Sequence, residues 1–291
     1  MKRTLLLTTA LGLSTLGLTA VSSSVIAHDL GHASSEKVEA VKINPQLAAA
    51  VASDFRSEKN AARDNYRNPA ETLAFLGIQA DDTVIELWPG GGWYTEILAP
   101  YLAEKGQYIG GIFETNPKED TKRTQYYAKA GKKFEAWLSE NKEAVGNAST
   151  VTFQPPASVD LGIENSADYV LTFRNLHNWA GQKQLENAFA SSYKVLKDGG
   201  VFGVVEHRAN PGMSFESGYM DQAEMIALAE KVGFTLVAAS EINANPKDTK
   251  DYAKGVWTLP PRLALEEQDK QKYLDIGESD RMTLKFVKNA K

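Results

Sequence analysis

Val84-Ile85-Glu86-Leu87-Trp88-Pro89-Gly90-Gly91-Gly92 is a short apolar run that ends in consecutive glycines. Its β-branched start predicts a buried strand, Asp82–Leu87, and the spacing of apolar residues in Trp93–Leu102 predicts a helix after the glycines. Glycines let the backbone bend tightly and approach a ligand closely, and a helix start offers free N–H groups. The stretch therefore predicts a ligand-binding turn between a strand and a helix.

The rest of the chain alternates short apolar runs with helical patterns, which predicts an α/β fold with a parallel sheet and helices on both faces. The further predicted strands are Tyr108–Phe113, Val151–Phe153, Ala167–Phe173, Val201–Glu206, Phe234–Ala239 and Met282–Val287. The further predicted helices are Pro45–Ser57, a short one from Pro69, Asp120–Glu143, Gln182–Leu196 and Asp221–Val232. The long irregular segment Glu241–Asp280 interrupts the pattern, and Leu263–Tyr273 is a candidate helix within it.

Composition excludes several classes of protein. The chain has 291 residues, 43% hydrophobic and 24% charged, values ordinary for a globular protein. Its formal net charge is 32 − 37 = −5, which argues against a general nucleic-acid binder. It has no cysteine, which excludes disulfides, thiolate nucleophiles and iron–sulfur clusters.

The first residues have the pattern of an export signal. Lys2 and Arg3 precede Thr4–Ala27, a run without charge that ends in Val25-Ile26-Ala27. The small residues at its end favour cleavage after Ala27 over an uncleaved membrane anchor. We therefore expect a secretory signal peptide at 1–27, a flexible leader at 28–42, and a single domain at 43–291. The mature protein is expected to be periplasmic or secreted, without stable membrane insertion.

The glycine-rich turn is similar to a known nucleoside-binding turn. It lacks the third glycine of a dinucleotide-binding G-x-G-x-x-G turn, because Thr95 stands there. It resembles the turn of class I S-adenosylmethionine-dependent methyltransferases, with Glu86 as the strand acid and Gly90 and Gly92 as the bend. Trp88 replaces the usual first glycine of that family.

The resemblance extends over about residues 70–290. Its further matches are Glu114, the stretch Ala167–Trp179, the turn Leu196–Phe202 and Gly233-Phe234. Glu86–Tyr94, Gly255-Val256-Trp257 and Gly277–Met282 also resemble a group of predicted exported bacterial methyltransferases. The resemblance implies a doubly wound, mostly parallel seven-stranded sheet whose last strand is antiparallel: a Rossmann-like methyltransferase fold with S-adenosylmethionine as cofactor.

The resemblance also implies a set of cofactor-binding residues at the carboxyl ends of the strands. Glu114 would bond the ribose hydroxyl pair, because one carboxylate can accept two O–H donors. The expected set is Glu86, Pro89, Gly90, Gly91, Gly92, Glu114, Arg174 and Asn175.

His177, Glu206 and His207 are the candidate catalytic residues, because each stands near a strand carboxyl end, where sites assemble. Histidine titrates near neutrality and serves as a general base when a methyl acceptor must lose a proton. The alternative interpretation is ordinary polarity at the ends of strands. No metal site is expected.

Residues 241–280 are predicted to cover the substrate pocket as a lid. An antiparallel last strand would begin at the edge where the other strands end. Trp257, Glu278, Asp280 and Arg281 would then face the site and close it, excluding water. The alternative is a static wrap that only stabilises the sheet edge.

Two functions remain open at this point. The first is S-adenosylmethionine-dependent methyl transfer to a small molecule, without nucleic acid as a partner. The second is an exported ligand-binding protein, non-catalytic or differently catalytic, that retains a nucleoside pocket. Export favours the second, because S-adenosylmethionine is made in the cytoplasm. The sequence names neither the methyl acceptor nor the oligomeric state.

Overall fold

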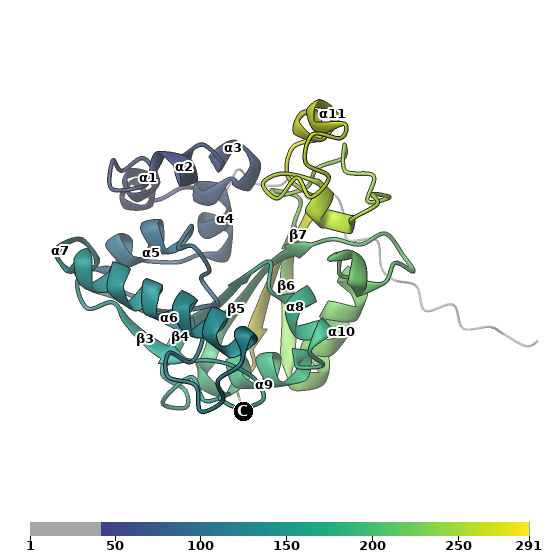
Figure 1. The fold of residues 1–291 in the computed structure, drawn as a ribbon. Helices are drawn as coiled ribbons and strands as arrows, with labels where there is room; N and C mark the ends of the chain where they lie inside the picture. The colour runs from purple at the N-terminus through teal and green to yellow at the C-terminus, as the bar shows by residue number, and fades with distance from the viewer. Residues whose placement is uncertain (1–41, 291) are drawn as a thin grey trace, which may run out of the picture. The chain divides into compact units, whose positions relative to one another are not determined.

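A computed structural model describes residues 42–290, which belong to one compact unit with a seven-stranded sheet (Figure 1). The strand order is β3-β2-β1-β4-β5-β7-β6. The strands are β1 Thr83–Leu87, β2 Gln107–Ile112, β3 Ser149–Thr152, β4 Ala167–Phe173, β5 Leu196–His207, β6 Phe234–Ser240 and β7 Arg281–Lys288. β7 is antiparallel to both neighbours, and the pairs formed by β1 to β5 are parallel. The predicted fold class is thereby confirmed, including the antiparallel last strand.

Helices cover both faces of this sheet, and an apolar core lies between the helices and the sheet on each face. The α-helices are α1 Pro45–Val51, α2 Glu58–Ala61, α3 Asp64–Arg67, α4 Pro69–Leu76, α5 Thr95–Leu102, α6 Lys122–Glu140, α7 Lys142–Val145, α8 Leu176–Gly181, α9 Leu185–Val195, α10 Gln222–Val232 and α11 Lys270–Ile276. Helices α1, α4, α5 and α6 bury residues in one core, and α8, α9 and α10 in the other. The 3₁₀ turns are Phe215–Ser217 and Gly255–Thr258.

The structure differs from several predictions of helices. The helix from Pro45 ends at Val51 rather than Ser57, because the Ser53 hydroxyl accepts a hydrogen bond from the backbone N–H of Phe55 at 3.2 Å and turns the chain. Leu263–Tyr273 is not one helix: Leu263, Glu266 and Asp269 have φ values of 46°, 55° and 51°, and the helix begins only at Lys270. Helix α8 was not predicted.

The strand order brings the predicted site residues to one edge of the sheet. The order reverses between β1 and β4, and ligands of open α/β sheets bind outside the carboxyl ends of strands at such a point. β7 starts at the same edge, where Arg281 pairs with His207 of β5. In Figure 1, α3 and α11 lie beyond this edge, and Arg67 of α3 contacts Glu278 just before β7.

The expected signal peptide, 1–27, and almost all of the expected leader, 28–42, lie outside the described residues. Among residues 42–290, no helix has the length and apolar character needed to cross a bilayer.

Candidate functional site

The glycine-rich turn keeps a left-handed backbone even where glycine is replaced. Trp88 has φ 48°, Gly90 has φ 61° and Gly92 has φ 78°. This backbone conformation is strained for a tryptophan. Packing offsets that strain: the Trp88 indole N–H donates to the Phe153 carbonyl at 2.8 Å, and its ring lies 5.2 Å from that of Trp179. The large side chain is therefore turned into the core.

A cavity of about 470 Å³ lies beside this turn, within the size range of small-molecule sites. It lies between the turn, the end of β2 and helix α6. Its lining residues are Trp88, Pro89, Gly90, Gly91, Ile112, Phe113, Tyr126, Tyr127, Ala130, Gly131, Phe134, Asn175 and Asn178. A Cβ atom added at Gly91 would meet nothing within 4 Å, so the backbone there is open to a ligand.

Asn175 joins the end of β4 to the turn. Its side-chain amide donates to the Leu87 carbonyl at 2.8 Å and to the Thr172 hydroxyl at 3.2 Å. It is buried and lines the cavity. Asn175 therefore fixes the turn relative to β4 at the point where the strand order reverses.

Glu86 lies beneath the turn rather than on the cavity wall. It is 2% exposed and accepts hydrogen bonds from the Tyr108 hydroxyl at 2.6 Å and the Thr95 hydroxyl at 2.9 Å. Burial raises the pKa of Glu86 to about 7, against the opposing effects of these bonds and of Arg174. Glu86 thus connects β1 and β2 with the start of α5.

Four members of the predicted cofactor set do not line the cavity. Glu114 follows β2, is partly exposed, and accepts a hydrogen bond from the backbone N–H of Asn116 at 2.8 Å. Among the described residues, those that line the cavity do not include Glu86, Gly92, Glu114 or Arg174. The structure therefore brings Pro89, Gly90, Gly91 and Asn175 together at the cavity, and the other four residues of the predicted set do not line it.

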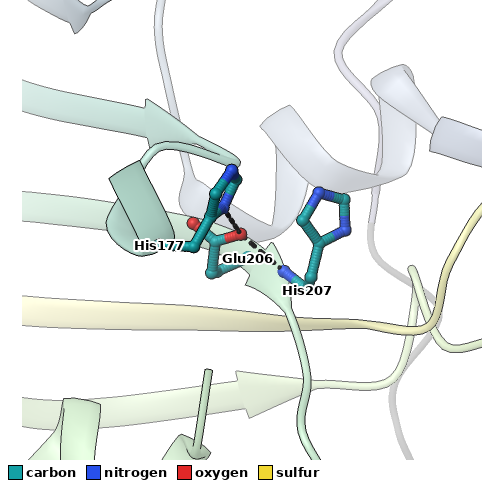
Figure 2. Close-up of side chains that lie close together, drawn as sticks. All are labelled: His177, Glu206 and His207. Atoms are coloured by element: carbon teal, nitrogen blue, oxygen red, sulfur yellow. Dashed lines mark hydrogen bonds and ion pairs between the residues drawn. The ribbon is translucent and has the colours of Figure 1, made fainter. Parts of the chain in front are cut away.

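His177, Glu206 and His207 come together at the end of β5, as Figure 2 shows. His177 Nδ1 lies 3.1 Å from Glu206 Oε1, and Glu206 is fully buried. Glu206 also accepts hydrogen bonds from the backbone N–H of Leu176 at 2.6 Å and of His207 at 2.8 Å. These bonds fix the carboxylate, which in turn orients the His177 ring.

Asn178 connects this pair with the cavity. Its side-chain amide nitrogen lies 3.1 Å from His177 Nε2, and Asn178 is itself a lining residue. With Nδ1 held by Glu206, Nε2 is the ring nitrogen directed toward that wall. The geometry is that of an oriented imidazole at the rim of a small-molecule cavity.

His207 is neutral at ordinary pH. Burial, then the neighbouring His177 and arginines, hold its pKa well below the usual range. Its Nδ1 lies 2.5 Å from the Ser279 hydroxyl, and its ring centroid lies 5.4 Å from that of His177. His207 therefore acts as a neutral hydrogen-bonding group rather than as a cation.

The same three residues offer possible metal-ligand atoms within 4.8 Å of one another. Both oxygens of Glu206 already accept hydrogen bonds from the protein. A metal would have to displace His177 from Glu206 or bind alongside these bonds. The observed contacts fit the orientation of His177 without a metal.

The predicted lid residues are mostly buried contacts. Trp257 is 40% exposed, and its ring lies 6.0 Å from that of His177. Glu278 and Arg281 are buried and form an ion pair with each other at 3.0 Å. Asp280 pairs with Arg208 at 2.9 Å and thereby ties the segment to the end of β5.

Arg67 of α3 and Arg63, directly before this helix, are site residues that the sequence does not predict. Both pair with Glu278, from more than 200 positions away in the chain, at 2.7 Å and 3.0 Å. No local motif marks them. Only the closeness of α3 to the start of β7 reveals their role.

The sequence matches no protein-family model, and it matches no curated protein. Solved structures with a similar chain layout include a SAM dependent methyltransferase from Aquifex aeolicus, at 15% identity over 62% of this chain and 87% of that one, with a TM-score of 0.47. The cyclase SpnF is 15% identical over 84% and 93%, with a TM-score of 0.49. An arsenic (III) S-adenosylmethionine methyltransferase from Chlamydomonas reinhardtii is 16% identical over 86% and 75%, with a TM-score of 0.46.

Proposed function

We propose that this protein transfers a methyl group from S-adenosylmethionine to a small-molecule acceptor. The observation that carries the proposal is the open cavity at the glycine-rich turn, with the His177–Glu206 pair at its rim. The methyltransferase-type order of the strands supports the same conclusion. The proposed cofactor site and the proposed base thus lie at adjacent strand ends.

The residues at the cavity fit S-adenosylmethionine. The open backbone at Gly91 leaves room for a ligand beside the turn, and Phe113 and Tyr127 supply aromatic surface for an adenine ring. Pro89, Gly90, Gly91 and Asn175 would hold the cofactor. Glu114, which follows β2, is proposed to reach the ribose from beside the cavity.

The bound cofactor would supply a methyl group already activated on a sulfonium. The protein then has to orient the acceptor, exclude water and accept a proton where the acceptor must lose one. His177 Nε2 is the proposed proton acceptor. Glu206 holds the proton of His177 on Nδ1 and stabilises the imidazolium that forms, because the two groups already lie 3.1 Å apart.

Gly91→Val tests the cofactor site with little risk to the fold. Gly91 has no positive φ, and its added side chain would enter the open space at the cavity wall. We expect at least tenfold weaker S-adenosylmethionine binding by calorimetry, with an unchanged melting temperature. The control is Gly181→Val, at the end of α8, where an added Cβ also meets nothing within 4 Å but which does not line this cavity. Equal binding by both variants and the wild type would contradict the proposed site.

We also propose that the protein is exported, on the pattern of Lys2, Arg3 and Thr4–Ala27. Fractionation of cells that produce the full chain tests this proposal. The protein is expected outside the cytoplasm with His28 as its first residue. Recovery from the cytoplasm with residues 1–27 intact would contradict it.

A further inference from the structure

Three arginines pair with one carboxylate where α3 meets the start of β7, and a fourth arginine lies nearby. Arg63 Nη2 lies 2.7 Å from Glu278 Oε1, and Arg67 Nε lies 3.0 Å from Glu278 Oε2. Arg281 Nη1 also lies 3.0 Å from Oε2. Arg174, directly after β4, is near enough to lower the pKa of Arg67 by like-charge repulsion. These four arginines are called the arginine cluster below.

The arginine cluster is short of negative charge. Three of its four cations pair with Glu278, and no acceptor is paired with Arg174 within residues 42–290, so the cluster has an excess of 4 − 1 = 3 positive charges. Burial, followed by repulsion from Arg174, lowers the pKa of Arg67 to about 8. The nearby Asp280 is already paired with Arg208 and Lys250, so it does not relieve the excess.

Several donors of the arginine cluster have no acceptor. Arg67 Nη1 and Arg281 Nε are buried without a hydrogen-bond partner, in side chains 3% and 2% exposed. Within residues 42–290, the Arg174 side chain is partly exposed and makes no hydrogen bond or ion pair. Buried charged donors without acceptors are costly. A bound anion would satisfy them.

The arginine cluster lies beside the proposed base rather than in the cofactor cavity. Arg281 of β7 is the backbone partner of His207 of β5 in the sheet, and Arg174 precedes His177 by three positions. The charges of Arg174, Arg281 and Arg67 also help to lower the pKa of His207. Of the described residues that line the 470 Å³ cavity, none belongs to the arginine cluster. A molecule held by these arginines would extend toward the histidines.

We propose that the arginine cluster binds a carboxylate or phosphate group of the methyl acceptor. The identification of the ligand as the acceptor rests on the proposed function. Guanidinium groups present two parallel N–H donors that match both oxyanions. Arg174 contributes an unpaired guanidinium, and Arg67 and Arg281 contribute their remaining donors. The acceptor is thus a small anionic molecule, anchored beside His177.

Calorimetric titration of the wild type with inorganic phosphate and with acetate, at constant ionic strength, tests the proposal. We expect saturable binding of at least one anion by the wild type. Arg174→Gln should bind it at least tenfold more weakly, because it loses about one pair of charged hydrogen bonds. Arg174→Gln breaks no side-chain hydrogen bond or ion pair within residues 42–290, so it should fold normally. Arg174→Lys should be intermediate, because it keeps the charge but loses the paired donors.

Arg262→Gln is the matched control, since it removes the same formal charge from an exposed position. It should bind the anion as the wild type does. Tighter phosphate than acetate binding would point to a phosphorylated acceptor, and the reverse to a carboxylate. Absence of anion binding by the wild type, or equal binding by Arg174→Gln, would overturn the inference. S-adenosylmethionine binding without anion binding would refute only this inference; anion binding without S-adenosylmethionine binding would refute only the proposed function.

Discussion

Glu278→Gln should destabilise the protein, because it removes the one carboxylate shared by the buried Arg67 and Arg281 and by the partly exposed Arg63. Burial alone would raise the pKa of Glu278, but the charges of Arg67, Arg281 and Arg63 outweigh it and lower the pKa to about 2. The difference from the ordinary value of 4.5 corresponds to about 3 kcal/mol of stability at neutral pH. That value agrees with the cost of breaking a buried ion pair, about 3–5 kcal/mol.

The pH dependence gives this prediction a second readout. Because the folded-state pKa of Glu278 is lowered, its stabilisation is complete above pH 4.5 and is lost as the pH falls toward 2. About 1 kcal/mol should be lost by pH 4 and about 2 kcal/mol by pH 3. Glu278→Gln lacks this titration, so the free energies of unfolding of the two proteins should converge in acid.

Urea unfolding at pH 7.5, 5, 4 and 3 measures this difference directly. Glu241→Gln is a suitable control, because Glu241 pairs with Arg208 but is 69% exposed, and exposed pairs contribute little. A cost below about 0.5 kcal/mol for Glu278→Gln at pH 7.5, or a cost that does not shrink in acid, would refute the reasoning.

Two further predictions concern the turn and the segment 241–280. The folded-state pKa of Glu86 is raised to about 7, so the folded state holds a proton that the unfolded state releases near 4.5. The free energy of unfolding should therefore fall by up to about 3 kcal/mol between pH 4.5 and 7. This pH dependence should vanish in Glu86→Gln, and an unchanged pH dependence in that variant would show that another group causes it. If residues 241–280 act as a lid, trypsin should cut at Lys247, Lys254 or Arg262 more slowly with S-adenosylmethionine than without it, and equal rates would favour a static wrap.

The sheet could be predicted because its signals are local. Buried parallel strands appear as short apolar runs, and Gly90-Gly91-Gly92 marks the turn after the first of them. Helix α8 lacks such a signal, because Asn175 at its start provides no side-chain cap and only two of its residues are buried. The positive φ values that interrupt Leu263–Asp269 fall on residues with no glycine to announce them.

The candidate site was predictable only in part, for a topological reason. His177, Glu206 and His207 follow strand ends, and the order of parallel strands brings such residues together. Arg67 belongs to the short helix α3 and Arg63 directly precedes it, and their contact with Glu278 depends on how this helix packs. The burial of Glu86 likewise depends on Tyr108 and Thr95, whose hydroxyls meet it from β2 and α5.

Calorimetry of the purified protein with S-adenosylmethionine and with S-adenosylhomocysteine tests the central claim most directly. Saturable binding of both is expected in the wild type and in Gly181→Val, with at least tenfold weaker binding in Gly91→Val. A ligand that binds only the folded state should also stabilise the wild type by about 2.7 kcal/mol at a concentration of 100 Kd. No heat of binding and no thermal shift at millimolar concentrations of either compound would contradict the account.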